Sequence, residues 1–232
     1  MKRKNLIAGA LLLTVLTGCG AEKAPAETQP ETAAEVQTQV QTEAPAEAQS
    51  ELPTVPKNEN TLWVPEGTEL RMAQTEHNPE LAAVIAETYG IPQEEWGGTR
   101  YYYDYVDLND DGVDEIFAVV MGMYTSGSGG DSALIVQPAA GMTVSQQFTL
   151  VHSPILVSDG LTNGVHDLIF LRSGGGSEPA FVRLTSTDGI YGNPADAEAL
   201  PNLNGITGTA ILCNDAAADL DSGSALTLNG RE

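Results

Sequence analysis

The chain has 232 residues, with 32 Asp or Glu but only 10 Lys or Arg, so its formal net charge at pH 7 is −22. This excess of negative charge disfavours nucleic acid and anionic lipid surfaces as direct partners. It favours a well-solvated surface and the binding of cations.

The N-terminus has the organisation of a bacterial lipoprotein signal. Residues 2–4 are basic, and residues 6–16 form an apolar run of 11 residues. That run is too short to cross a membrane, which takes about 20 residues, but it suits the core of a signal peptide. The run ends in LTGC, a lipobox in which small residues precede Cys19. We expect residues 1–18 to be removed as a signal peptide and Cys19 to carry lipid, which would anchor the protein to a cell membrane outside the cytoplasm.

Residues 19–60 read as the lipidated cysteine followed by a disordered acidic linker. Ala, Glu, Gln, Thr and Pro dominate this segment, and it has no aromatic residue. Such a segment cannot bury enough apolar surface to offset the entropy lost on ordering. A partly helical stalk is the alternative, but Pro25, Pro30 and Pro45 disfavour it.

Residues 61–232 are long enough for one domain with a hydrophobic core. The first element that we predict there is a helix, because Asn78 suits an N-cap and Pro79 the first helical position. Apolar residues then recur on one face up to Tyr89, and Gly90 ends the pattern. We expect this helix to pack against the rest of the domain.

After residue 99 the chain reads as short strands separated by turns rich in Gly, Asp, Asn and Pro. Strands of this length and spacing predict an antiparallel meander or sandwich. The expected fold is therefore α+β, mainly antiparallel β with one N-terminal packing helix, in a single β-rich extracytoplasmic domain. The predicted strands are RYYYDYV, EIFAVVMGMY, DSALIVQP, SQQFTLV, PILVS, HDLIFLRSG, AFVRLTST and GTAILC, and DAAADLDSG is predicted to form a short helical turn.

The stretch DLNDDGVDE at residues 107–115 has the spacing of a calcium-binding loop. Calcium takes six to eight oxygen ligands from a flexible loop, and a glycine at the sixth position permits a sharp turn. The metal ligands that we predict are Asp107, Asn109, Asp111, Val113 through its carbonyl, and Glu115. The alternative is a metal-free turn in which the Asp and Asn side chains bind their own backbone. An EF-hand is excluded because its twelfth position is Ala118 and strands, not helices, flank the loop.

A second stretch echoes this one at an offset of 52 residues, with 107–122 matching 159–174. Two related β-hairpins would explain the match, and chance similarity between two Gly/Asp turns is the alternative. Leu161 and Asn163 occupy the third and fifth positions of the second copy, so we expect that copy to bind no metal.

The loop resembles the calcium loops of FG-GAP and related β-hairpin repeats. Between about residues 100 and 195, the loop is followed by NGVHDLIFLRSGGG and YGNP. This order is similar to that in a group of small bacterial lipoproteins and periplasmic proteins with a DLNGDG loop, an NGW.DLIV..GGG segment and a Y..NP segment. The resemblance implies a β-rich exported domain and no particular activity.

Few residues fit an enzyme's chemistry. The three histidines share no metal-ligand spacing, and Cys213 reads as a small core residue. The leading interpretation is an exported, lipid-anchored, non-enzymatic binding or structural module whose loop takes a calcium ion. Its partner would be an unknown envelope protein or glycan, with no role for nucleic acid. The alternatives are a glycan-directed hydrolase of the cell envelope, using carboxylates such as Asp104 and Glu178, and an inhibitor or sensor of an envelope enzyme.

Overall fold

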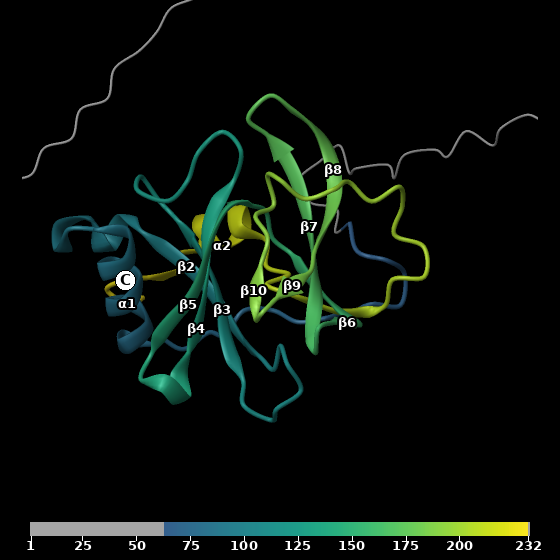
Figure 1. The fold of residues 1–232 in the computed structure, drawn as a ribbon. Helices are drawn as coiled ribbons and strands as arrows, with labels where there is room; N and C mark the ends of the chain where they lie inside the picture. The colour runs from purple at the N-terminus through teal and green to yellow at the C-terminus, as the bar shows by residue number, and fades with distance from the viewer. Residues whose placement is uncertain (1–62, 232) are drawn as a thin grey trace, which may run out of the picture. The chain divides into compact units, whose positions relative to one another are not determined.

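The computed structural model describes residues 63–231 (Figure 1). The predicted signal peptide, the lipidated Cys19 and the linker at 19–60 lie outside the described residues. Within residues 63–231, no helix has the length and hydropathy needed to span a membrane.

The domain is rich in antiparallel strands and has few helices, as the sequence predicts. Two 3-10 helices, η1 (Gln93–Gly98) and η2 (Pro138–Ala140), occur in connections. The other elements are β1 (Glu69–Leu70), α1 (Pro79–Tyr89), β2 (Arg100–Val106), β3 (Glu115–Met121), β4 (Asp131–Gln137), β5 (Thr143–Val151), β6 (Ile155–Thr162), β7 (Val165–Gly174), β8 (Ser177–Leu184), β9 (Ser186–Thr187), β10 (Ile190–Tyr191), β11 (Gly208–Ile211), α2 (Ala216–Ser222) and β12 (Leu226–Thr227).

The strands form two five-stranded sheets and one small hairpin (Figure 1). The first sheet has the order β12-β2-β3-β4-β5, so four consecutive strands make a meander. The second sheet has the order β1-β11-β6-β7-β8, and β9 pairs with β10 in the hairpin. All of these pairs are antiparallel except β1 with β11, which are parallel.

The hydrophobic core lies between the two sheets. Phe117 and Phe148 come from the first sheet, and Phe170 comes from the second. The ring centroids of Phe148 and Phe170 are 5.8 Å apart, and those of Phe117 and Phe170 are 6.3 Å apart. Fully burying one such side chain contributes about 1.5–3 kcal/mol relative to leaving it exposed. The sandwich arrangement follows from burying one face of each sheet against the other.

Helix α1 covers the outer face of the first sheet, as predicted (Figure 1). The side chain of Asn78 caps its start by accepting a 3.0 Å hydrogen bond from the backbone N–H of Leu81. Gly90 ends it in the left-handed region, at φ 63°. Leu81 and Ile85 are completely buried against strands that include Ile116.

The outer face of the second sheet is covered by loop residues instead of a helix. Trp63 packs on Phe181 with ring centroids 4.9 Å apart. Ile206 and the partly buried Leu203 belong to the same cluster. Cys213 lies there as well, buried, and burial raises the pKa of its thiol. The prediction that Cys213 is a core residue is therefore confirmed.

The two glycine-rich segments that follow β3 and β7 pack against each other. The backbone N–H of Gly175 donates a 3.2 Å hydrogen bond to the carbonyl of Ser128. A Cβ at Gly174 would overlap that same carbonyl oxygen, and its φ of 77° is in the left-handed region. These glycines therefore permit a close approach of two backbones, which joins the ends of the two sheets.

Both echoed segments form β-hairpins, but the two hairpins close with loops of different length. The β2–β3 hairpin closes with Val106 opposite Glu115, which leaves eight residues in its loop. The β6–β7 hairpin closes with Thr162 opposite Val165, so its turn contains only Asn163 and Gly164. Leu161 is thus part of strand β6. The second copy therefore says nothing about how the 107–115 loop behaves without metal.

Candidate functional site

The 107–115 loop joins the ends of β2 and β3 at one edge of the sandwich. Two of its residues have left-handed backbone conformations: Asp110 has a φ of 58° and Gly112 a φ of 83°. Asp and Gly tolerate this region better than other residues do. These two positions turn the chain back toward Glu115, where β3 begins.

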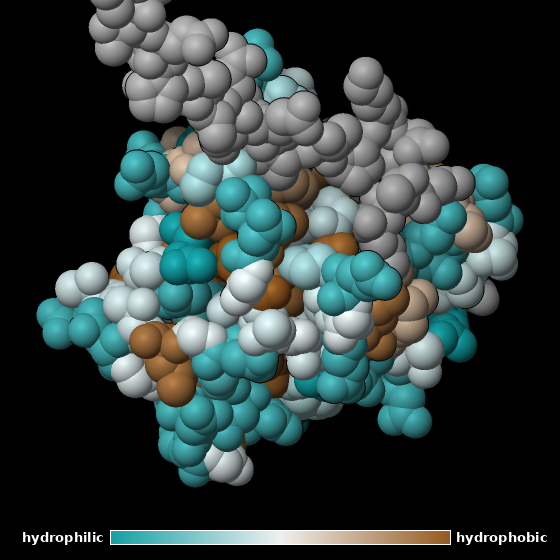
Figure 2. Space-filling model, turned by 90° about the vertical axis from the view of Figure 1, so that its right-hand side faces the viewer, coloured by the Kyte–Doolittle hydropathy of each residue, from teal (hydrophilic) through white to brown (hydrophobic). Residues whose placement is uncertain are grey.

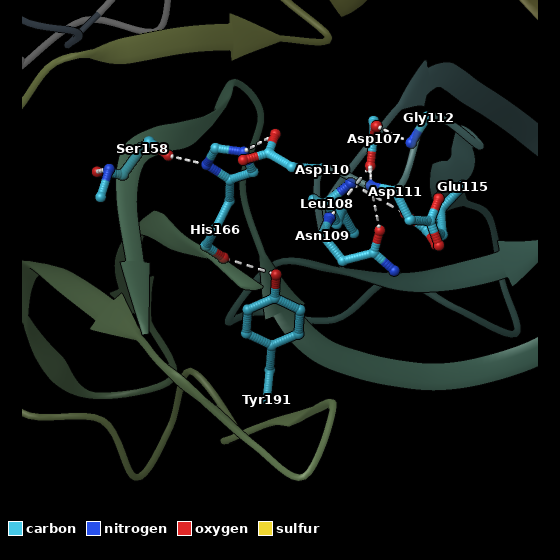
Figure 3. Close-up of polar contacts among 11 residues, drawn as sticks. Asp107, Leu108, Asn109, Asp110, Asp111, Gly112, Glu115, Ser158, His166 and Tyr191 are labelled. Atoms are coloured by element: carbon cyan, nitrogen blue, oxygen red, sulfur yellow. Dashed lines mark hydrogen bonds and ion pairs between the residues drawn. The ribbon is translucent and has the colours of Figure 1, made fainter. Parts of the chain in front are cut away.

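The carboxylate of Asp107 organises the loop (Figure 3). Its Oδ2 accepts a 2.7 Å hydrogen bond from the backbone N–H of Gly112. Its Oδ1 accepts bonds of 3.3 Å and 3.2 Å from the N–H groups of Asn109 and Asp111. Desolvation raises the pKa of Asp107, but these N–H donors outweigh it, and the pKa lies below its ordinary value. The carboxylate is therefore held in its ionised form.

The next two predicted ligands repeat the same local bond. Oδ1 of Asn109 accepts from the N–H of Asp111 at 3.0 Å, and Oδ1 of Asp111 accepts from the N–H of Val113 at 2.8 Å. Each bond spans two residues, which is the geometry of an Asx turn, and side chains bonded to their own backbone are what the metal-free alternative expects. Asn109, Asp111 and Val113 are exposed, so these oxygens face solvent.

Glu115 differs from the other predicted ligands because its side chain is buried. Its Oε2 accepts a 3.0 Å hydrogen bond from the backbone N–H of Leu108 (Figure 3). Burial raises the pKa of Glu115, and the negative charges of Asp111 and Asp107 raise it further. A nearby cation would favour the ionised form of this carboxyl group.

Hydrogen bonds thus link Asp107, Asn109 and Asp111 within the loop, and Glu115 to the backbone of Leu108. Among residues 63–231, no three His, Cys, Asp or Glu side chains converge closely enough to hold a metal ion by themselves. Those four residue types omit the Asn109 amide oxygen and the Val113 carbonyl. Each carboxylate oxygen has a second lone pair beyond the hydrogen bond that it accepts. The donor set, three carboxylates with an amide and a carbonyl oxygen, suits a hard cation such as calcium.

The side chain of Asp110, the fourth residue of the loop, contacts the second sheet, which the sequence does not predict. Oδ1 of Asp110 lies 3.0 Å from Nε2 of His166 in β7 (Figure 3). The backbone N–H of His166 also donates a 2.8 Å bond to the carbonyl of Leu108. Asp110 and His166 lie 56 positions apart in the chain. No local signal in the sequence announces the pair, although both belong to the echoed segments.

An open cleft of about 450 Å³ lies beside the loop, between the two sheets. Its lining mixes polar and apolar residues, and it includes Asp107, one of the predicted ligands. The lining residues are Arg71, Tyr105, Val106, Asp107, Asp114, Val157, Ser158, Asp159, His166, Thr209 and Ile211.

The positive charge of Arg71 at this cleft is neutralised by Asp104. Nη2 of Arg71 lies 2.9 Å from Oδ2 of Asp104, which is completely buried, and donates to the carbonyl of Tyr105 at 2.8 Å. Gln74 donates to the other carboxylate oxygen at 2.7 Å. The remaining carboxylates make the cleft negative.

The carboxylates that the hydrolase alternative relies on have different surroundings. Asp104 is buried and paired with Arg71, whereas Glu178 is exposed on β8 of the other sheet. A second cleft of about 600 Å³ lies between β8 and residues 192–201, and neither carboxylate lines it. The geometry therefore does not pair Asp104 with Glu178 across a cleft.

The three histidines lie in separate places. Nδ1 of His77 is 3.1 Å from the hydroxyl of Tyr101, and Nε2 of His152 is 3.1 Å from the hydroxyl of Ser173. His166 alone contacts the acidic loop.

Comparisons of the chain with protein-family models, with curated proteins and with solved structures found no match. The candidate site therefore rests on its own geometry.

Proposed function

We propose that the protein is an exported, lipid-anchored, non-enzymatic binding or structural module, and that its 107–115 loop holds one calcium ion. The observation that carries the loop assignment is the hydrogen-bond network centred on Asp107. Its carboxylate is ionised and fixed in position by three backbone N–H groups, with further oxygens at every second residue. This arrangement orders a loop whose carboxylate, amide and carbonyl oxygens are the ligand types that a hard cation takes.

Calcium would be held by the side chains of Asp107, Asn109, Asp111 and Glu115 and by the carbonyl of Val113. When bound, it would supply positive charge to a loop that is otherwise acidic. The ends of the loop continue into β2 and β3, so a bound ion would fix one end of this hairpin. Its contribution would be structural stabilisation, with no catalytic step assigned to it.

The lipobox LTGC supports the membrane anchor, and the acidic surface supports a partner other than nucleic acid. An envelope protein or a glycan remains the proposed partner class. The negative cleft beside the loop is where a bound calcium would border a partner, because Asp107 belongs to both.

No observation favours the inhibitor or sensor alternative, which would present one large exposed apolar patch. The large exposed apolar side chains come from several separate segments, namely Leu70, Met72, Val113, Met123, Tyr124, Leu161, Ile190 and Leu220. On the face shown in Figure 2, hydrophobic residues form small groups between hydrophilic ones.

Two experiments test the proposal. In cell fractionation, the wild-type protein should enter the membrane fraction and be released by detergent but not by a chelator, whereas Cys19→Ala should become soluble. Retention of Cys19→Ala in the membrane fraction would refute the lipid anchor. Binding to purified cognate cell envelopes should fall with a chelator and in Asp111→Ala. Equal binding in all three conditions would refute a calcium-dependent module.

A further inference from the structure

Both ring nitrogens of His166 face hydrogen-bond acceptors (Figure 3). Nδ1 lies 2.7 Å from the carbonyl oxygen of Ser158, and Nε2 lies 3.0 Å from Oδ1 of Asp110. A carbonyl oxygen and an ionised carboxylate can only accept a hydrogen bond. The imidazolium cation, with a proton on each nitrogen, can satisfy both acceptors, whereas a neutral ring can satisfy only one.

The backbone of His166 holds the same loop. Its N–H donates a 2.8 Å bond to the carbonyl of Leu108, and the side chain of Leu108 is buried in the core between the sheets. The hydroxyl of Tyr191 in turn donates to the carbonyl of His166 at 2.7 Å. Positions two and four of the loop are thus fixed from β7, while the odd positions carry the predicted metal ligands.

The charges around His166 favour its cationic form. Burial lowers the pKa of His166, but the hydrogen bonds to Asp110 and Ser158 and the charges of Asp110 and Asp159 outweigh it, so the pKa lies above its ordinary value. Asp107, Asp114 and Arg71 line the same cleft. Arg71 is paired with Asp104, which leaves the carboxylates as the dominant field.

We propose that His166 is a positioning residue for the 107–115 loop, and that its imidazolium latches this loop to the second sheet through Asp110. The latch requires no bound ion, so this inference goes beyond the calcium proposal and does not depend on it. In this proposal His166 holds the loop in place. Because His166 and the loop residue Asp107 line the same cleft, His166 also helps to set the shape of that cleft.

The latch has a defined pH dependence. Because the folded-state pKa of His166 is raised, the stabilisation is fully present below the ordinary histidine value and is lost as pH rises through the folded pKa. Above that pH the neutral ring can still donate to only one of its two acceptors. One of the two contacts, and the charge attraction to Asp110, is therefore lost when the ring becomes neutral.

The latch can be tested by NMR titration of the metal-free protein, following the ring of His166 and the backbone amides of the loop. In the wild type, the amides of Asp110 and Gly112 should titrate with the same midpoint as the His166 ring. In Asp110→Asn, that midpoint should fall, because the ring loses the negative charge of its hydrogen-bond partner. In His166→Gln, which keeps a donor but cannot be charged, the amides should lose this transition. Asp114→Asn is the matched control, and it should leave the loop amides coupled to the ring.

Two outcomes would overturn the latch: loop amides that ignore the His166 transition in the wild type, or a midpoint that is unchanged in Asp110→Asn. A repeat with saturating calcium separates this inference from the proposed function. An ion in the loop should lower the His166 midpoint through repulsion between the two cations. A midpoint unmoved by calcium would count against the calcium site, while the metal-free result would still decide the latch.

Discussion

The backbone N–H of Gly112 donates a 2.7 Å hydrogen bond to Oδ2 of Asp107, which joins the first and sixth residues of the acidic loop directly. Gly112 can direct its N–H inward because its φ of 83° is readily available to glycine. The Asp107 side chain therefore closes the loop without a bound cation. A cation would add to hydrogen bonds that already order the loop.

Replacing Asp107 by Ala should destabilise the loop, because the backbone N–H groups of Asn109 and Gly112 lose their acceptor and that of Asp111 loses one of two. We expect Asp107→Ala to lower the free energy of unfolding in urea more than Asp114→Ala does. Asp114 is an exposed aspartate of the same loop and provides the matched control. Equal effects of the two substitutions would show that Asp107 does not organise the loop.

The raised pKa of Glu115 should make the stability of the metal-free protein depend on pH. The folded-state pKa of Glu115 is raised, so the metal-free protein binds this proton more tightly when folded. The free energy of unfolding should therefore carry a favourable contribution at low pH, which is lost as pH rises from the ordinary value of 4.5 through the folded pKa.

The variant Glu115→Gln isolates this contribution from those of other carboxyl groups. The difference in unfolding free energy between wild type and Glu115→Gln should change with pH in that window. With saturating calcium the sign should reverse, because the ionised carboxylate becomes a ligand. A difference that does not change with pH would contradict a raised pKa for the buried Glu115 carboxyl group.

Replacing Arg71 in its ion pair with Asp104 should lower the free energy of unfolding. Asp104 is completely buried, whereas Arg71 is 37% exposed. Arg71→Met would leave the buried carboxylate without its cation and should cost about 2–3 kcal/mol, less than a fully buried pair. Asp104→Asn keeps an acceptor for Gln74 and should cost less. Chemical denaturation of both variants measures the difference, and a larger loss in Asp104→Asn would contradict this assignment.

Gly174 should tolerate a methyl group far less well than its neighbour Gly176. Both have positive φ angles, 77° and 86°, but a Cβ at Gly174 overlaps the Ser128 carbonyl, and one at Gly176 meets nothing within 4 Å. Gly176→Ala should cost about 1 kcal/mol from backbone strain alone, and Gly174→Ala at least about 1 kcal/mol more. Similar thermal unfolding midpoints for the two variants would contradict the close packing of the glycine-rich segments.

The sequence predicted those parts of the fold whose signals are local. Helix α1 has its cap at Asn78 and its stop at Gly90, and the long strands have continuous apolar runs. The two-residue strands β1 and β12 were missed because only their partners in the sheets define them. The turn at Asn163 was misjudged because spacing alone does not show where a hairpin closes.

The site was predicted to the same extent. The network around Asp107 depends on residues within five positions, so the pattern of the loop was sufficient to find it. The contact of Asp110 with His166 depends on how two sheets meet, which no local pattern encodes. Likewise, the burial of Glu115 follows from the packing of β3 in the core and not from its position in the loop.

The most direct test of the central claim is a calorimetric calcium titration of the purified protein, with Asp111→Ala as the control. The account predicts one binding site, with a Kd of roughly 0.1–1 mM, as is usual for extracellular calcium modules. It predicts that Asp111→Ala loses this binding while it stays folded. An absence of binding heat at millimolar calcium, or equal binding by wild type and Asp111→Ala, would contradict a calcium site in the 107–115 loop.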